Sequence, residues 1–282
     1  MSRFAGKTAV ITGAGSGIGR ALAYGLAAQG AALALSDVDD TGLAETVAHV
    51  RQMGVDVRSD RLDVTDRDGV LAYADAVAEQ FGGVHLVINN AGIAFTGDVA
   101  EMTFSDIERI MDVDFWGVVN GTKAFLPHLI ASGDGTLVNI SSLFGLLSVP
   151  SQGAYNAAKF AVRGFTEALR QEMLIASYPV RVTCVHPGGI KTAIARNAGA
   201  VPSRDATVLG EFFDRRLAKT SADRAARTIL RAAERGRARV LVGLDAWMLD
   251  LFVRVTGSGY QRIGAALAKR LAPQPKQSTH IT

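Results

Sequence analysis

The glycine-rich stretch Thr12-Gly13-Ala14-Gly15-Ser16-Gly17-Ile18-Gly19 lies near the start of the chain, between two segments of opposite character. Before it, Lys7-Thr8-Ala9-Val10-Ile11 is a short β-branched run that predicts a buried strand, and residues 20–27 after it have the pattern of a helix. Glycines in such a turn let the backbone approach a pyrophosphate, and the N–H groups at a helix N-terminus complement its negative charge. The stretch therefore predicts a dinucleotide site.

The second predicted strand, residues 31–36, is followed by Asp37. A carboxylate about twenty residues after the glycines can accept hydrogen bonds from both ribose hydroxyls of an adenosine, and it would repel a 2′-phosphate. Neither Ser16 in the turn nor Val38 after the aspartate supplies the cation that NADP would need. NAD is therefore expected in preference to NADP, with an ordinary solvated turn residue as the alternative interpretation of Asp37.

Short apolar runs alternate with longer helical patterns along the rest of the chain. This alternation predicts a single α/β domain: a Rossmann-type, doubly wound parallel sheet of about seven strands, with helices on both faces and ligands at the carboxyl ends of the strands. One helix is expected to end at Phe81, and others to begin near Thr103 and Gly153. The expected strands are residues 7–11, 31–36, 55–62, 84–89, 136–141, 180–186 and 239–242.

Composition is that of an ordinary soluble globular chain, with 282 residues, 48% hydrophobic and 20% charged. The single cysteine, Cys184, excludes an internal disulfide and lies in an apolar run, as expected in a reducing compartment. The first residues do not resemble a signal peptide, and no apolar run reaches the length of about eighteen residues that a membrane span requires. The cytoplasm is the expected location.

Charge is distributed unevenly. Residues 181–282 carry eighteen Lys and Arg against seven Asp and Glu, a net charge of +11, whereas residues 1–180 carry −8. Solvated helix faces are one explanation, because Arg224, Arg227 and Arg231 recur at helical spacing, and an anionic partner is the other. Nucleic acid is not expected, since no aromatic platform or recognition motif accompanies the positive charge.

Tyr155 and Lys159 are four residues apart on a predicted helix, so both side chains lie on the same face. A phenol with a pKa of about 10 is a poor base at neutral pH unless a neighbouring cation stabilises the phenolate. The pair therefore suggests a tyrosine that exchanges a proton next to a lysine. Ser142 precedes Tyr155 by thirteen residues.

These residues and their order resemble the short-chain dehydrogenase/reductase family over residues 5 to 245. The resemblance implies that Tyr155 is the general acid/base, that Lys159 lowers its pKa and binds the nicotinamide ribose, and that Ser142 orients and polarises the substrate carbonyl. A turn cap is the alternative for Ser142, and Ser141 is the rival serine. The motifs that carry the resemblance are the glycine turn at 12–19, Asp63-Val64, Asn89-Asn90-Ala91-Gly92, Ser142, Tyr155 with Lys159, and Pro187-Gly188-Gly189-Ile190-Lys191-Thr192.

The same resemblance implies a set of cofactor contacts and no metal. Asp63 and Val64 would flank the adenine, and Asn90 and Gly92 would line the ribose. Ile190 and Thr192 would contact the nicotinamide end. Each has a structural alternative: Asp63 as a helix cap, the 89–92 turn as a plain glycine turn, and Thr192 with Lys191 as a cap. The complete expected set is Gly13, Ser16, Gly17, Ile18, Gly19, Asp37, Asp63, Val64, Asn90, Gly92, Tyr155, Lys159, Ile190 and Thr192.

Asp114 departs from the family pattern, because it falls where the family usually has a catalytic asparagine that orders a water in a proton relay through the lysine. Aspartate is nearly isosteric with asparagine, but when ionised it cannot donate a hydrogen bond and adds negative charge near Lys159. Asp114 is therefore expected to keep the relay with an altered pH dependence. The alternative is that its side chain points away from the site.

The expected substrate is a lipophilic secondary alcohol or ketone. An apolar lid is predicted at residues 193–219, which include Ile194, Val201, Val208, Leu209, Phe212 and Phe213. Further apolar residues border Ser142 or follow the 89–92 turn, although each of them could equally belong to the core. They are Phe95, Leu143, Phe144, Leu146, Leu147 and Val149.

Beyond the dehydrogenase domain at 1–245, residues 246–272 are expected to form an amphipathic helical extension, and residues 273–282 a disordered tail. The extension could pack on the lid or on a partner subunit, attach to an anionic membrane, or be a plain surface helix.

Two functions are compatible with these features. The first is an NAD-dependent alcohol dehydrogenase or ketone reductase, and the alternative is a non-catalytic NAD-binding sensor or scaffold on the same fold. The family resemblance also suggests a homotetramer or dimer built through the helices at 103–131 and 153–178.

Overall fold

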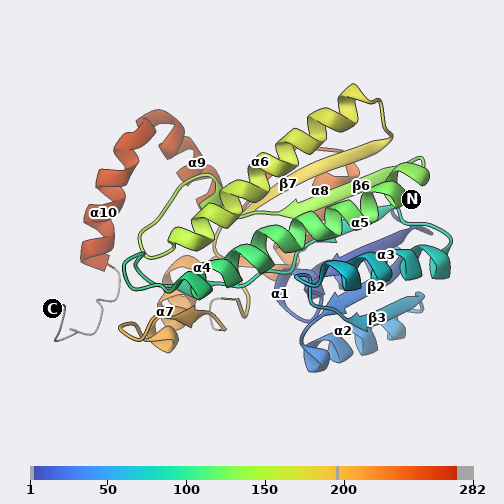
Figure 1. Cartoon of the computed structure of the whole chain (residues 1–282), viewed down its shortest axis with the longest axis horizontal. Coiled ribbons are helices and arrows are strands. Elements are labelled where there is room, and N and C mark those ends of the chain that lie inside the picture. Colours follow the sequence, from blue (N-terminus) through green and yellow to red (C-terminus); the bar gives the residue numbers. More distant parts are fainter. Residues whose placement is uncertain (1–2, 195–196, 272–282) are drawn as a thin grey trace.

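A computed structural model describes residues 3–194 and 197–271. All seven expected strands are present, with ends within two residues of the expectation, and they form one parallel sheet in the order β11-β7-β6-β4-β1-β2-β3 (Figure 1). The predicted doubly wound fold is confirmed. The strands are β1 (Thr8–Thr12), β2 (Ala32–Asp37), β3 (Val57–Arg61), β4 (Leu86–Asn89), β6 (Gly135–Ile140), β7 (Val180–Pro187) and β11 (Arg239–Val242).

Helices cover both faces of the sheet, which explains why the central strands are apolar on both sides. In β1, Ala9 and Ile11 belong to one buried cluster while Val10 belongs to the other, as the twofold alternation of a strand requires. One face carries α1 (Gly17–Ala27), α2 (Asp40–Gln52) and α8 (Ala222–Glu234), and the other carries α3 (Arg67–Phe81), α5 (Gly117–Ala131) and α6 (Gly153–Ile175).

The helix expected near Thr103 begins at Phe104, because Thr103 is its N-cap and forms a reciprocal capping box with Asp106. This helix, α4 (Phe104–Met111), continues into α5 through a π-helical turn, η1 (Asp112–Trp116). A π-turn inserts an extra residue and so changes which side chains face inward. This turn carries Asp114.

The segment predicted as a lid, residues 193–219, contains β9 (Gly199–Ala200), α7 (Ala206–Phe212) and η3 (Phe213–Leu217). It is flanked by β8 (Ile190–Lys191) and β10 (Thr220–Ser221). Strand β9 pairs with β5 (Phe95–Thr96), and β10 pairs with β8. These pairings attach the segment to the loops that follow β4 and β7.

Two helices follow β11, namely α9 (Leu244–Thr256) and α10 (Tyr260–Leu271). Figure 1 shows both at one end of the molecule, beside the start of α6, with α10 standing away from the sheet. The tail expected to be disordered, residues 273–282, lies outside the described residues. None of the described helices combines the length and the apolar character needed to cross a bilayer.

The positive charge on α8 is explained by its position. Arg224, Arg227 and Arg231 are exposed, whereas Ala225 and Ile229 between them are buried against the sheet. These arginines therefore form an exposed helix face, which is compatible with both explanations that the sequence left open.

Candidate active site

The glycine turn after β1 is fastened to the turn after β4. Asn90 Nδ2 donates to the carbonyl oxygens of Thr12 and Gly13, both at 3.0 Å, and the backbone N–H groups of Asn90 and Ala91 donate to Thr12 Oγ1. A Cβ at Gly13 would lie 2.8 Å from Ala91 Cα, so only glycine allows this approach. The side chain of Asn90 therefore shapes the turn, which supports a structural role for it.

The N-terminus of α1 is open to an anion. The N-cap residue, Ser16, makes no side-chain capping bond within the described part of the chain. A Cβ at Gly19 would collide with Gly13 O, and one at Gly17 would lie 3.1 Å from Thr192 Cβ. These contacts keep a bare backbone turn at a helix start, which is the arrangement that fits the pyrophosphate of a dinucleotide.

The segment predicted to contact the nicotinamide end folds onto this same turn. Ile190 and Thr192 are both buried, and Thr192 lies against Gly17. Thr192 lies in a bend after β8 and is followed by a turn, so its role as a cap of that segment stays an alternative.

Asp37 lies at the end of β2, beside the glycine turn. Its Oδ2 accepts from Gly15 N at 2.7 Å, and its Oδ1 accepts from Asp39 N at 3.0 Å. The sequence interpretation missed Arg20, whose guanidinium donates to the carbonyl oxygens of Gly15 and Gly42 and pairs with Glu45 at 2.8 Å. This nearby cation is thus engaged by two backbone carbonyls and one carboxylate.

Asp63 is not the cap of α3, so that alternative is wrong. The N-cap is Asp66, which accepts from Gly69 N at 3.1 Å. Asp63 Oδ1 instead accepts from the N–H and the hydroxyl of Thr65, at 2.9 and 2.8 Å. The next residue, Val64, is buried.

Lys159 lies at the centre of the residues that the sequence predicted to be catalytic. Its side chain is almost fully buried, and its Nζ is 5.4 Å from the centre of the Tyr155 ring and 3.3 Å from Asp114 Oδ2. Gly92 lets the backbone pass beside this pair, since a Cβ there would lie 3.2 Å from Asp114 Oδ1 and 3.4 Å from Lys159 Nζ. The structure thus brings Gly92 and Asp114 to Tyr155 and Lys159 from distant parts of the sequence.

Asp114 faces the site, so the alternative that it points away is wrong. It is completely buried, and its Oδ1 accepts from Ile93 N at 2.7 Å. Oδ2 has an ion pair with Lys159 but no directed hydrogen bond to any described residue. This oxygen is therefore available for a further hydrogen bond. It can donate one when the carboxyl is protonated, or accept one from a water or from a group on the substrate.

Burial and charge act against each other in this group. Burial raises the pKa of Tyr155, Lys159 opposes that rise, Asp114 adds to it, and the net pKa is raised. Lys159 therefore acts to lower the pKa of Tyr155 as expected, but burial and Asp114 outweigh its effect. Burial acts to lower the pKa of Lys159, but Asp114 and Tyr155 outweigh it, so that this pKa is raised. Burial also raises the pKa of Asp114, although the positive charge of Lys159 acts to lower it.

The two adjacent serines have different environments. Ser141 is buried, and its hydroxyl donates to Lys159 O at 2.8 Å, so it holds α6. Ser142 lies beside Tyr155 and acts to lower the pKa of its phenol. Ser142 Oγ also accepts from Phe144 N at 3.1 Å, so it caps the short turn as well. Ser142, not its rival, is thus the serine beside the tyrosine.

Comparison with known proteins now decides the family. The family model described as short chain dehydrogenase matches residues 7–202. The chain belongs to the short-chain dehydrogenase family.

Several relatives extend this result. SadH of Mycobacterium tuberculosis, provisionally named an oxidoreductase, is 64% identical over 276 residues, which cover 98% of this chain and 100% of that protein. A short-chain dehydrogenase/reductase of Burkholderia phymatum in complex with NAD is 32% identical, with a TM-score of 0.85 and full coverage of both chains. An alcohol dehydrogenase of Thermococcus sibiricus complexed with 5-hydroxy-NADP is 28% identical, with a TM-score of 0.68 and coverage of 83% and 94%. The chain is thus an oxidoreductase of a family that binds nicotinamide cofactors.

The tyrosine of this short-chain dehydrogenase lies among apolar side chains. Phe144 meets the Tyr155 ring edge-on at 6.1 Å, and Phe95 and Val201 belong to the cluster against which Tyr155 packs. The expectation for the residues after Ser142 is only partly met, because three of the expected lining residues are buried under the C-terminal helices. These are Leu143, Leu146 and Leu147.

His186 at the end of β7 is a residue that sequence reasoning missed. It is completely buried, and its Nδ1 lies 3.0 Å from Ser142 O. A carbonyl only accepts, so Nδ1 carries the proton, and Nε2 has no partner among the described residues. In the sequence, its position directly before the motif Pro187-Gly188 was the signal that could have pointed to this residue. His186 is therefore a positioning residue that fixes the backbone of Ser142.

His186 is expected to make stability depend on pH. Burial lowers its pKa to about 4, and Arg239 and Arg163 act in the same direction. Because the unfolded histidine has the higher pKa, the unfolded chain binds the extra proton, and stability falls as pH drops from about 6.5 towards 4. Through His186, the wild type should lose about 2 kcal/mol of unfolding free energy between pH 7 and pH 5. In His186→Gln this part of the loss should be absent when the unfolding free energy is measured by urea denaturation. The exposed His49→Gln is the control, and equal pH slopes in wild type and His186→Gln would contradict the assignment.

Proposed function

We propose that this short-chain dehydrogenase is an NAD-dependent oxidoreductase that interconverts a lipophilic secondary alcohol and its ketone, with Tyr155 as general acid/base. The observation that carries the proposal is the buried ammonium of Lys159, 5.4 Å from the Tyr155 ring. A buried cation is costly and needs anionic or polarised partners, and a phenolate next to it is such a partner. A non-catalytic sensor would have no need for this arrangement.

Each residue of the proposed site has its own role in the reaction. The nicotinamide, when bound, accepts or supplies the hydride. In the oxidative direction the Tyr155 phenolate removes the hydroxyl proton of the alcohol as the carbonyl forms, and in the reductive direction the phenol returns it. Ser142, which lies beside Tyr155, holds the same substrate oxygen. Lys159 stabilises the phenolate, and Asp114 holds Lys159 in place.

Cofactor preference follows from the carboxylate at the end of β2. Asp37 lies against the glycine turn through Gly15 N, where an adenosine ribose would approach, and Arg20 is occupied. The NAD complex of the Burkholderia relative agrees with this preference, whereas the Thermococcus relative carries an NADP analogue. We therefore propose NAD as the preferred cofactor. Gly13, Ser16, Gly17, Ile18 and Gly19 would hold its pyrophosphate.

The substrate class is inferred from Phe144, which meets the Tyr155 ring, and from the apolar cluster against which Tyr155 packs. Phe144, Phe95 and Val201 are apolar, and Val201 comes from the segment 193–219. Since β9 of this segment pairs with β5, we propose that it closes over the substrate as a lid on the dehydrogenase domain of residues 1–245. An apolar wall of this kind favours a lipophilic alcohol over a sugar.

We also propose that the chain forms a homodimer or homotetramer through α4, α5 and α6. Phe104, Trp116 and Phe160 are large apolar side chains left exposed on α4, η1 and α6. A second copy would bury them, as in other symmetric oligomers. Light scattering should give a molar mass of two or four chains, whereas the mass of one chain at micromolar concentration would contradict this proposal.

The activity is tested on a panel of secondary alcohols and ketones of increasing lipophilicity, followed through the absorbance of NADH. We expect turnover that increases with lipophilicity and falls by about 100-fold or more in Tyr155→Phe, because general acid/base catalysis typically contributes that much. NAD binding without turnover on any compound in either direction would contradict the proposal and favour a sensor.

The same assays with NADP test the cofactor preference. Asp37→Ser should lower the ratio of kcat/KM for NAD to that for NADP by about tenfold, since the ribose contacts and the repulsion of a 2′-phosphate are both lost. Asp39→Ser, which alters a neighbouring exposed carboxylate, is the matched control. A wild-type preference for NADP would overturn this part of the proposal.

Asp114 should control the pH dependence of oxidation. Asp114 raises the pKa of Tyr155, so replacing its charge in Asp114→Asn should move the rising limb of the pH–rate profile to lower pH. Asp112→Asn, an exposed residue of the same π-turn, is the control. A profile in Asp114→Asn that coincides with that of wild type would show that the carboxylate does not act on the reacting tyrosine.

A further inference from the structure

The C-terminal helices expose a continuous apolar row. On α9, the residues Leu244, Trp247, Met248, Leu251 and Val255 recur at helical spacing, and each of them is at least 62% exposed. The opposite face of α9 is occupied, because Ala246 is completely buried. The exposed row is therefore a second apolar face of α9, whose first apolar face is packed against the body of the protein.

Contacts with the body hold α9 in this orientation. Ala246 and Val253 pack in the cluster that contains Leu143 and Leu146, close to Ser142. Asp245 Oδ2 accepts from Gly189 N at 2.6 Å at the start of the helix. The outward direction of the apolar row is thus set by the fold.

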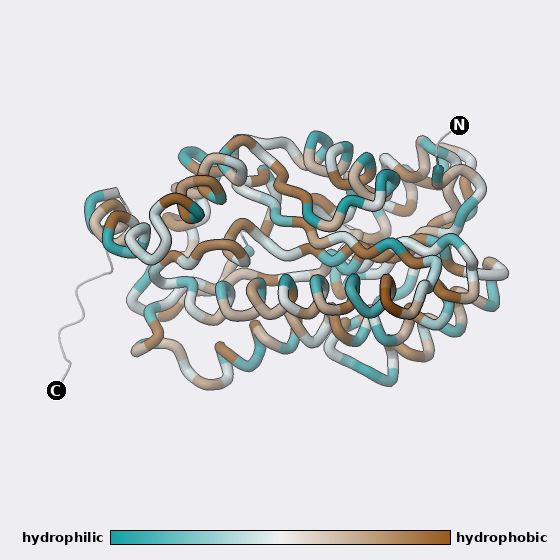
Figure 2. Tube along the Cα trace, turned by 90° about the horizontal axis from the view of Figure 1, so that it is seen from above, coloured by the Kyte–Doolittle hydropathy of each residue, from teal (hydrophilic) through white to brown (hydrophobic). Residues whose placement is uncertain are grey.

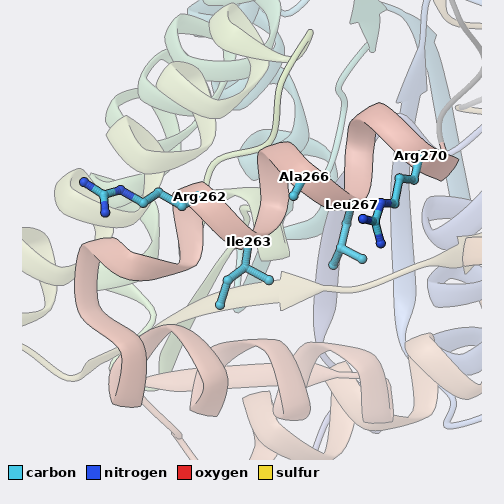
Figure 3. A pocket seen from close by; sticks show the side chains of 5 residues that line it. All are labelled: Arg262, Ile263, Ala266, Leu267 and Arg270. Carbon is cyan, nitrogen blue, oxygen red and sulfur yellow. The ribbon is translucent and has the colours of Figure 1, made fainter.

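The second helix, α10, adds apolar and basic side chains. Figure 3 shows Ile263 and Leu267 projecting from the same side of α10, and Arg262 and Arg270 line the same hollow. Ile263 and Leu267 are about half exposed. Figure 2 shows hydrophobic residues in these helices at the end of the molecule, away from the central layer. Large exposed apolar side chains gathered at one end of a molecule mark an interaction site.

The charges identify the kind of partner. The sequence of α10, Tyr260–Leu271, contains Arg262, Lys269 and Arg270 and no acidic residue. On α9, Arg254 lies at the edge of the apolar row and pairs with Asp250 at 2.8 Å. Exposed tryptophan and aliphatic side chains beside Lys and Arg are the composition of a helix that lies in the interface of an anionic bilayer. A second copy meeting the same face would oppose like charges.

We propose that α9 and α10 dock the protein on the surface of an anionic lipid bilayer, with the row from Leu244 to Val255 inserted among the lipids and the basic residues of α10 at the headgroups. The end of the molecule that holds Ser142 and Tyr155 then lies near the lipid surface, because α9 packs on the loop after Ser142. The docking itself is independent of the proposed function, since binding can be measured without substrate or cofactor.

Cosedimentation of the full chain with vesicles tests the proposal. Vesicles of equimolar phosphatidylcholine and phosphatidylglycerol should bind the protein at low salt, whereas phosphatidylcholine alone or high salt should reduce binding. Leu251→Ser combined with Val255→Ser should weaken binding by about tenfold or more, because apolar area no longer enters the lipid. Leu174→Ser combined with Ile175→Ser, which are exposed at the end of α6, is the matched apolar control.

Two further measurements distinguish a loss of lipid binding from a folding defect. Arg262→Gln combined with Arg270→Gln leaves the apolar row intact and should reduce binding to anionic vesicles only, whereas Arg227→Gln combined with Arg231→Gln on α8 should not. The chain has two tryptophans, so Trp116→Phe leaves Trp247 as the reporter, and its emission should shift to the blue on anionic vesicles.

Three results would overturn the proposal. They are the absence of binding to either vesicle at low salt, equal binding to neutral and anionic vesicles, and binding that the α9 and α10 variants leave unchanged. A concentration-dependent molar mass that the Leu251→Ser, Val255→Ser variant abolishes, together with no vesicle binding, would assign the row to a second copy of this chain.

Discussion

The buried ammonium of Lys159 is the constraint on which the rest of the site depends. A cation removed from water is tolerated only where partners compensate its lost hydration, and the structure supplies a carboxylate 3.3 Å away and a phenol ring beside it. Several local features serve this pairing. The π-turn η1 turns Asp114 inward, Gly92 allows the backbone to pass, and Ser141 holds the carbonyl of Lys159.

Aspartate at position 114 changes the balance of this group. A neutral side chain there would leave Lys159 free to favour the phenolate, whereas the carboxylate competes with Tyr155 for the same cation and raises the pKa of both partners. The carboxylate also has a raised pKa of its own, because it is completely buried. The three groups therefore titrate as one coupled unit, and a proton gained by any of them alters the others.

The sequence predicted the fold well and the site in part. All seven strands were expected because apolar runs and their spacing are local signals, and Ser142, Tyr155 and Lys159 were expected because their order and intervals form a recognisable pattern. Other features depend on contacts between distant segments, which periodicity does not report. The π-turn at Asp114, the bond from His186 to Ser142 O, the engagement of Arg20 and the burial of Leu143 under α9 all arise only when β-strand ends and helices meet.

The C-terminal helices and the active-site loop are parts of one packed unit. Tyr260 lies in the same apolar cluster as Leu146 and Leu147, and its hydroxyl accepts from Ser148 N at 3.1 Å. Any surface that holds α9 and α10 therefore also holds the loop that begins at Ser142. Interiors are close-packed, so a change in the position of α9 must be met by movement of that loop. Under the proposals of a lipophilic substrate and of docking on a bilayer, the substrate would reach Tyr155 along this same end of the molecule, and the C-terminal extension would influence both attachment and access.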